Sequence, residues 1–184
     1  MEKEQEIYKQ LSAPFTTIGA DGNEYPAHKW RIQSGKRCIP YIDARQVSER
    51  LNQVLGVDGW NNTIEETNQK MLISNLTCII GGKEVSHSDV GTQANTEKEK
   101  SMASDSLKRA AVHFGIGRYL YDIEPVTLPA NTPSDIIKDG AKLSSYINQL
   151  HPMRSKLTEI YKALGDSAKK LDKEFQAIWK AFKI

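Results

Sequence analysis

The first third of the chain changes between helical and irregular hydrophobic patterns. Residues 2–12 are typical of a short helix, and residues 14–26, which hold several Gly, Pro and Asn, are typical of loops and turns. From Asp43 onward apolar residues recur at helical spacing, and Gln46 completes a capping box with Asp43. The pattern therefore predicts a helix that begins at Asp43 and ends at Gly56.

Strand patterns lie on both sides of this helix. Residues 27–33 alternate between apolar and polar side chains, and residues 63–67, 71–80 and 83–90 are three further candidate strands. The Gly pair between the last two is a hairpin signal. Strands joined by hairpins, without intervening helices, predict an α+β fold with an antiparallel sheet packed on helices.

The most regular helical pattern covers residues 97–114. Thr96 and Glu99 form a second capping box, and Gly115 and Gly117 end the helix. Five apolar residues share one face of it: Ala103, Leu107, Ala110, Ala111 and Phe114. One buried face leaves the remaining positions of this helix for charged side chains.

These patterns divide the chain into four segments. Residues 1–26 form an N-terminal helix and loop, and residues 27–124 form the core. Residues 125–133 contain three prolines without periodicity, which predicts a linker. Residues 134–184 are expected to be helical, with Ser134 capping a helix that runs to about Leu150.

Composition and motifs narrow the class of protein. No apolar run approaches the roughly 18 residues that span a bilayer, and no secretory signal is evident, so we expect a cytoplasmic protein. The two Cys and four His lack zinc-ligand spacing, which predicts reduced thiols and no metal. The chain has no P-loop, GxSxG or HExxH motif, so we expect no nucleotide cofactor and no catalytic residues.

The net charge of +2 excludes a histone-like polycation but not a local basic surface. The cations of the 97–114 helix lie off its apolar face, and Arg118 follows it; together these candidate phosphate ligands are Lys98, Lys100, Lys108, Arg109 and Arg118. Phosphate contacts supply sequence-independent, salt-sensitive affinity for nucleic acid. The alternative is a solvated helix face with pairs such as Asp105 with Arg109.

A second set of candidates lies nearer the N-terminus. Arg45 falls in the first turn of its helix, where backbone N–H groups attract anions, although an exposed pair with Glu49 explains it equally well. Aromatic and basic residues also occur together at Trp30, Arg31 and Tyr41. Their rings would suit base stacking, whereas burial in a core or an interface is the ordinary alternative.

Several blocks, in order, resemble the Rad52 family of single-strand annealing proteins, in particular its phage and prophage branch. The resemblance covers roughly residues 27–124. The blocks are Trp30–Gln33, Tyr41–Arg45, Arg50–Asn52, Gly59-Trp60, Asp89–Gly91, Ala103–Ala111 and Phe114–Tyr121.

This resemblance implies a hairpin-rich sheet packed on helices, assembled into a ring or helical homo-oligomer with an outer groove for single-stranded DNA. It implies that Arg45, Lys100 and the Lys108-Arg109 pair lie in that groove. It also implies annealing without ATP, in recombination and double-strand break repair. One departure is Val112, which stands where eukaryotic members carry a further Arg.

Two other hypotheses remain open from the sequence. One is an adaptor whose C-terminal helices recruit a host single-strand-binding protein or helicase. The other is a metal-dependent nuclease that uses Asp89 and Asp105. A single-strand-binding protein or a phage exonuclease is also a possible partner of an annealing protein.

Overall fold

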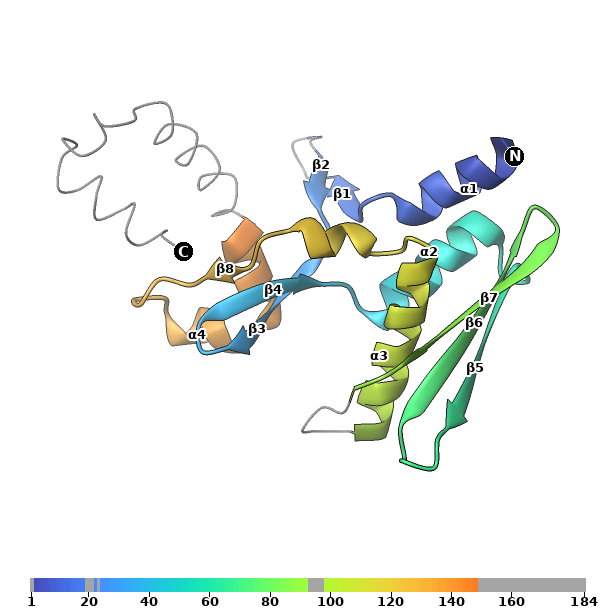
Figure 1. Ribbon diagram of the computed structural model, residues 1–184. Coiled ribbons are helices and arrows are strands. Elements are labelled where there is room, and N and C mark those ends of the chain that lie inside the picture. The colour runs from blue at the N-terminus through green and yellow to red at the C-terminus, as the bar shows by residue number, and fades with distance from the viewer. Residues whose placement is uncertain (1, 19–21, 23, 93–97, 149–184) are drawn as a thin grey trace, which may run out of the picture. The chain divides into compact units, whose positions relative to one another are not determined.

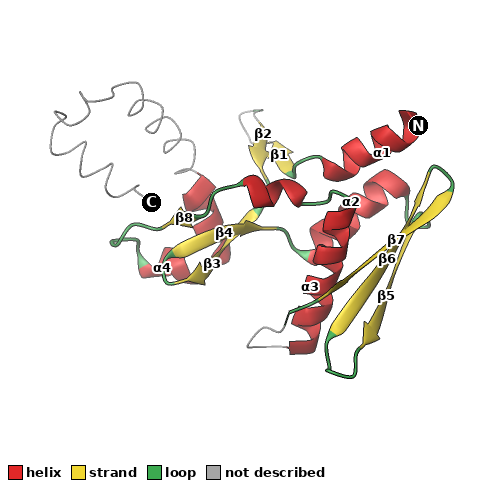
Figure 2. Ribbon diagram, viewed as in Figure 1, coloured by secondary structure: helices red, strands yellow, loops and turns green. Residues whose placement is uncertain are grey.

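Hairpin-linked strands and three helices form the first of two units in the computed structural model, which describes residues 2–18, 22, 24–92 and 98–148 (Figure 1). This unit comprises Met1–Thr17 and Ile42–Asp122. The second unit comprises Ile18–Tyr41 and Ile123–Ile184. Figure 2 shows helices and antiparallel strands in both, so the predicted α+β class is confirmed.

The sheet of the first unit is antiparallel, with strand order β5-β6-β7. Its strands are β5 (Trp60–Glu66), β6 (Leu72–Ile80) and β7 (Lys83–Val90), close to the three predicted strands. The register pairs Ser74 with Asp89 and Leu76 with His87. Because paired residues point to the same face, Asp89 and His87 share the face of the buried Leu76.

Helix α3 (Lys98–His113) packs on that face, against β6 and β7. Helices α1 (Glu2–Ser12) and α2 (Ala44–Leu55) also belong to the unit, and α2 contacts both α1 and α3. The predicted capping box of α2 is confirmed: Asp43 Oδ1 accepts from Gln46 N at 3.0 Å, and Gln46 Oε1 accepts from Asp43 N at 3.1 Å.

The core of the first unit contains three of the five residues predicted for the apolar face of α3, and a fourth, Leu107, is partly buried against it. It includes Ala110, Ala111 and Phe114 together with side chains from α1, α2 and β6 such as Leu11, Val47, Leu51, Leu76 and Cys78. Burying each large aliphatic side chain contributes about 1.5–3 kcal/mol. This shared core fixes which face of α3 turns to solvent.

The second unit contains a sheet of order β3-β4-β8, made of β3 (Lys29–Ser34), β4 (Arg37–Tyr41) and β8 (Val126–Thr127). A separate two-stranded sheet joins β1 (Thr16–Ile18) to β2 (Glu24–Pro26). The core of the unit groups Trp30, Cys38, Val126, Leu128, Leu143 and Ile147.

Two expectations for the C-terminal half were wrong. Residues 125–133 are not a linker, because β8 lies within them and Leu128 is buried. The helix predicted from Ser134 is interrupted: α4 (Ser134–Lys138) has no side-chain cap, and Asp139 starts a second helical segment by accepting from the N–H groups of Ala141 and Lys142. The helices expected beyond residue 148 lie outside the described residues.

Two further findings bear on cysteine chemistry and membranes. Cys38 and Cys78 are both buried free thiols, and burial raises the pKa of Cys78 to about 12. At neutral pH both thiols are therefore protonated and poorly nucleophilic.

Among the described residues, no helix has both the length and the apolar character needed to cross a bilayer.

Candidate nucleic-acid interface

The candidate interface is built on α3, whose buried face is fixed by more than apolar packing. Ser106 lies in this face, and its Oγ is 2.8 Å from Ser74 Oγ on β6, with both residues fully buried. A buried hydroxyl pair of this kind helps to set the rotation of the helix, because turning α3 would leave the buried Ser74 hydroxyl without this partner. Lys108 and Arg109 consequently lie at the rim of the packed face.

A close backbone contact holds α3 against the end of β7. A Cβ added to Gly91 would lie 2.0 Å from the carbonyl oxygen of Met102, so only glycine allows this approach. The Gly91 N–H also donates to Leu72 O at 2.9 Å. This contact brings Asp89, two residues earlier, alongside the exposed side of α3.

Asp89 is the centre of a charged cluster between β7 and α3. Its Oδ1 accepts from Arg109 Nε at 3.1 Å and from the Val90 N–H at 2.7 Å. Its Oδ2 is 3.5 Å from His113 Nε2. The Arg109 side chain nevertheless stays 44% exposed, and a guanidinium has further N–H donors beyond Nε. Asp89 therefore fixes the position of Arg109 without covering it.

Lys108 has its own carboxylate neighbour, Asp105. The two charged groups are 3.5 Å apart, one helical turn from each other. Asp105 Oδ2 also accepts from the Thr92 N–H at 3.1 Å and from Thr92 Oγ1 at 2.9 Å. The sequence suggested an alternative pair, Asp105 with Arg109. In the structure Arg109 instead forms its ion pair with Asp89, and Asp105 pairs with Lys108.

The pKa values of both carboxylates fall below their ordinary values. For Asp89, partial burial alone would raise the pKa, but hydrogen bonds from Arg109 and Val90 outweigh it. Burial would likewise raise the pKa of Asp105, but hydrogen bonds from Thr92 and the charge of Lys108 outweigh this effect. The hydrogen bond to Asp89 raises the pKa of Arg109. All these groups are thus charged at neutral pH.

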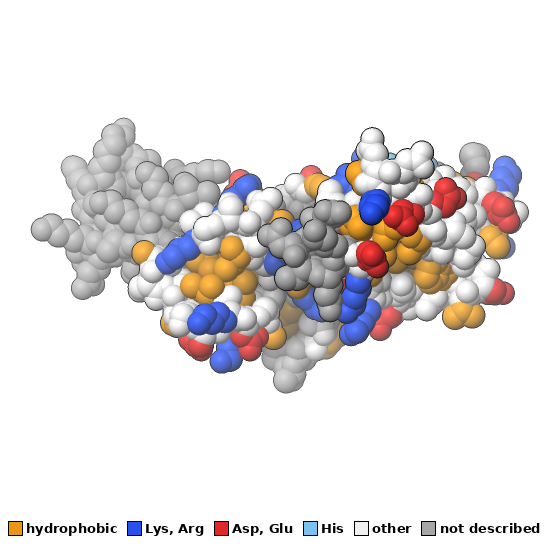
Figure 3. Space-filling model, turned by 90° about the horizontal axis from the view of Figure 1, so that it is seen from below, with side chains coloured by type: hydrophobic (Ala, Val, Ile, Leu, Met, Phe, Trp, Pro, Cys, Tyr) orange, Lys and Arg blue, Asp and Glu red, His pale blue; other side chains and the backbone are white. Residues whose placement is uncertain are grey.

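The cluster is therefore a charge-matched surface. Lys108 and Arg109 each face one carboxylate, and Figure 3 shows Lys and Arg side chains interspersed with Asp and Glu on the side of the molecule that it displays. A phosphate approaching it meets fixed donors instead of a broad positive field. The carboxylates assigned to a nuclease, Asp89 and Asp105, are the ones that hold these cations.

The other predicted cations of this unit lie on three elements. Arg45 is exposed in the first turn of α2, and Lys100 is exposed near the start of α3. Arg118 is exposed at the start of the 3-10 helix η1 (Arg118–Asp122). Lys98 begins α3, but its side chain and the cap expected at Thr96 lie outside the described residues.

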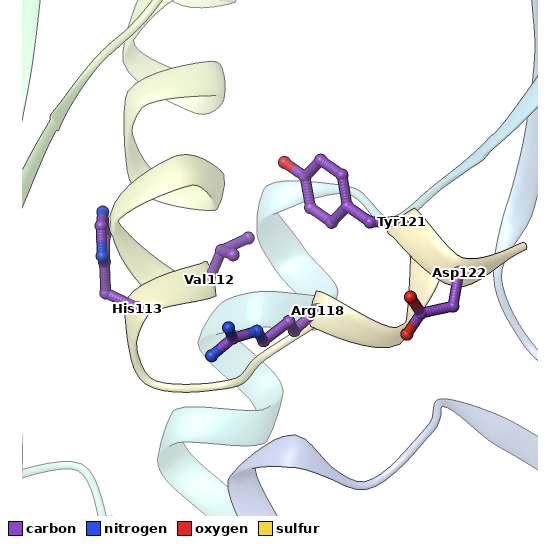
Figure 4. A pocket seen from close by; sticks show the side chains of 5 residues that line it. All are labelled: Val112, His113, Arg118, Tyr121 and Asp122. Carbon is purple, nitrogen blue, oxygen red and sulfur yellow. The ribbon is translucent and has the colours of Figure 1, made fainter.

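A pocket joins the end of α3 to η1. It has a volume of about 420 Å³ and is lined by Val112, His113, Arg118, Tyr121 and Asp122. In Figure 4 the Val112 side chain points toward Tyr121, and Arg118 extends back toward the last turn of α3. His113 lines the pocket and also contacts Asp89, so the pocket adjoins the Asp89 cluster.

The predicted aromatic candidates belong to the second unit. Trp30 is only 1% exposed, and its Nε1 donates to Asn148 Oδ1 at 2.8 Å. The expectation that Trp30 stacks on a base is thus corrected: its ring lies in a core. Arg31 is exposed and lies over the Tyr41 ring, with 5.8 Å from its guanidinium carbon to the ring centroid. Arg31 and Tyr41 remain candidates.

Residues 20–132 of the chain match the family model described as "Rad52/22 family double-strand break repair protein". The chain belongs to the Rad52/22 family. The matched residues include β7 and α3, which carry the Asp89 cluster, and the predicted resemblance to the Rad52 family is confirmed. The phage and prophage branch stays a prediction.

Two relatives come from the genus Deinococcus. The single-stranded DNA-binding protein DdrA of Deinococcus deserti is 35% identical over 125 residues, which cover 66% of this chain and 59% of that protein. DdrA of Deinococcus radiodurans is 32% identical over 127 residues, which cover 66% of this chain and 57% of that protein. The chain therefore spans less than two thirds of the length of either relative.

Proposed function

We propose that the protein binds single-stranded DNA and anneals complementary strands in homologous recombination and double-strand break repair. Membership of the Rad52/22 family and similarity to two single-stranded DNA-binding proteins support this function. The observation that carries it is the Lys108-Arg109 pair, held on the exposed rim of α3 within the matched region. Arg45, Lys100 and Arg118 extend the proposed contact surface.

The proposed recognition is of the sugar-phosphate backbone. Arg109 is oriented through Nε, so its remaining N–H donors can form charge-assisted bonds to phosphate oxygens. Because Asp89 and Asp105 reduce the local positive charge, binding depends on these placed donors more than on a diffuse field. Backbone contacts carry no sequence information, so the protein binds any single strand.

Annealing follows from such binding without a covalent step. Two complementary strands repel one another and fold on themselves, and cations along a surface neutralise phosphates and keep a strand extended. Base edges are then free to pair, and duplex stacking of about 1.4 kcal/mol per step drives the reaction. The proposed activity needs no nucleotide cofactor and no metal.

We propose further that several copies act together, as a ring or a helical oligomer. A single α3 offers contacts for few phosphates, whereas annealing needs a strand held over many nucleotides. Copies placed side by side would supply a continuous series of Lys108-Arg109 pairs. Light scattering that gives the mass of one 20.7-kDa chain at working concentration would contradict this part of the proposal.

The test is a strand-annealing assay. Two complementary labelled oligonucleotides are mixed with the full chain, with and without ATP and magnesium. We expect annealing to be faster than the spontaneous reaction under all conditions, with the DNA remaining intact. A rate equal to the protein-free control would contradict the proposal, and shortening of labelled DNA with magnesium would support a nuclease instead.

A further inference from the structure

Tyr121 stands out in the pocket at the end of α3 because its ring is open to solvent. Its exposure is 74%, against 46–49% for Tyr8 and Tyr25, the other exposed tyrosines within the described part of the chain. Most aromatic side chains bury their faces, since a phenol ring has a large apolar surface. An aromatic ring held open beside basic residues is the arrangement used for stacking on bases.

The pocket has both the size and the chemistry for a nucleobase. Its volume of about 420 Å³ lies within the roughly 300–1,000 Å³ typical of small-ligand sites. Val112 supplies an apolar wall opposite the tyrosine, and Arg118 supplies a cation at the edge. Asp122, the acidic lining residue, is directed away from the Tyr121 ring in Figure 4.

The pocket and the Asp89 cluster share one residue, His113. His113 lines the pocket and also contacts Asp89, the carboxylate that holds Arg109. The hydrogen bond to Asp89 raises the pKa of Arg109, and the phenol of Tyr121 adds a weaker contribution in the same direction. Arg118, on η1, lines the pocket itself, and Arg109 belongs to the Asp89 cluster that shares His113 with it.

We propose that this pocket receives one base of the bound single strand, which stacks on Tyr121 while Arg109 and Arg118 hold the adjacent phosphates. The inference rests on the proposed function, because it concerns the same strand. Every base has a π-face, so such a contact tolerates any sequence. Val112 is suited to this role, since an Arg at that position would fill the apolar side of the pocket with a charge.

The test separates the base from the backbone. Affinities are measured for the full chain with an oligo-dT strand and with an abasic strand of equal length, which has the same phosphates and no bases. Aromatic stacking contributes about 1–3 kcal/mol per base, so the Tyr121→Ala variant should bind oligo-dT about 5- to 150-fold more weakly. Its affinity for the abasic strand should not change.

Three control variants complete the design. Tyr121→Phe keeps the ring and should bind oligo-dT like the wild type. Tyr25→Ala removes another exposed tyrosine and should leave both affinities unchanged. Arg109→Ala should weaken binding to both strands, because it removes a phosphate contact. As Tyr121 is exposed, Tyr121→Ala should unfold at the same temperature as the wild type, which shows that a binding loss is local.

The outcomes also distinguish this inference from the proposed function. A Tyr121→Ala variant that loses affinity equally for both strands, or for neither, overturns the base pocket while single-strand binding stands. A Tyr121→Phe variant as weak as Tyr121→Ala would show that the hydroxyl acts and the ring does not, which also overturns it. Wild-type protein that binds neither strand overturns the proposed function itself.

A second readout reports on the base directly. A strand carrying a fluorescent 2-aminopurine loses emission when that base stacks on an aromatic ring. We expect the wild type and Tyr121→Phe to quench the emission more than Tyr121→Ala does at saturating protein. Equal quenching by all three would contradict the assignment of Tyr121.

Discussion

Arg50 and Arg109 lie in the same unit, yet their surroundings give them opposite roles. Arg50, on α2, donates to carbonyl oxygens at the end of α1 and just beyond it: Gln10 at 2.8 Å, Leu11 at 3.3 Å, Ala13 at 2.6 Å and Pro14 at 3.4 Å. Its guanidinium also lies 4.2 Å from the centre of the Phe15 ring. Arg109 has one carboxylate partner and an exposed side chain.

The difference shows how a structural cation is distinguished from a ligand-binding one. The last carbonyls of a helix lack partners within it, and Arg50 supplies donors to those of α1. Burial lowers the pKa of Arg50, which reflects the desolvation of its charge. Arg109 faces solvent and stays available to an anion. Both residues lie in family blocks, so the motifs alone do not separate the two roles.

The largest expected effect is on stability, at Arg50. Arg50→Ala leaves four carbonyls without their donor, two in the last turn of α1 and two just beyond it, so we expect the free energy of unfolding to fall by about 2–4 kcal/mol. Urea denaturation measures this change. Affinity for single-stranded DNA, measured per folded molecule at low temperature, should stay within about two-fold. A large loss of affinity in folded protein would place Arg50 in the interface.

The second effect is on binding, at Arg109. Arg109→Ala removes a phosphate ligand, and we expect affinity for single-stranded DNA to fall about 5- to 20-fold. The Asp89–Arg109 pair is partly exposed, so the free energy of unfolding should change by less than about 1 kcal/mol. Fluorescence anisotropy and urea denaturation measure the two quantities. A loss of stability as large as that of Arg50→Ala would make Arg109 structural.

A matched pair of lysine substitutions sharpens the contrast. Arg50→Lys keeps the charge but cannot supply the planar set of donors, so about 1–2 kcal/mol of stability should be lost. Arg109→Lys keeps the charge beside the phosphates, so its affinity should fall less than about three-fold, with the same dependence on salt. If Arg109→Lys binds as weakly as Arg109→Ala, the contact depends on guanidinium geometry and not on charge.

The smallest effect concerns acid stability. Because the pKa of Asp89 is lowered in the folded protein, its contribution to stability is present above the ordinary value of 3.8 and is lost as pH falls below it. Asp89→Asn removes this titration. Between pH 7 and pH 3 the wild type should therefore lose slightly more stability than the variant, by less than about 1 kcal/mol. Identical pH profiles of stability in the two proteins would show that ionisation of Asp89 does not stabilise the fold.

Local patterns were sufficient to predict the elements that carry the site. The capping box at Asp43, the hairpin strands and the apolar face of α3 all follow from short-range spacing. The predicted strand at 27–33 also corresponds closely to β3. These features depend on residues within one or two turns of each other, and their local preferences agree with the packing.

Features that depend on distant partners were missed. Pro40 argues against a strand, yet β4 accommodates it because β8 pairs only with Arg37 and Cys38, so Pro40 has one neighbouring strand there. The prolines on either side of β8 favoured a linker, whereas burial of Val126 stabilises a strand there. Trp30 looked like a stacking residue because its partner, Asn148, is 118 residues away.

The partner of Arg109 was also outside the reach of helical spacing. The sequence suggested Asp105, four residues away, whereas Asp89 lies on β7. The register of the hairpin was the available signal, since alternation from the Gly81-Gly82 turn places Asp89, His87 and Leu76 on one face. Only the packing of α3 on that face shows that Asp89 meets Arg109.

The most direct test of the proposed function is the salt dependence of single-stranded DNA affinity in the wild type and in the Lys108→Ala/Arg109→Ala double variant. Each phosphate contact contributes about 0.7 to the slope of log affinity against log salt. We predict that the double variant binds at least about ten-fold more weakly and that its slope is smaller by about 1.4 for each subunit engaged. Equal affinity and equal slope in the two proteins would contradict the assignment of this surface.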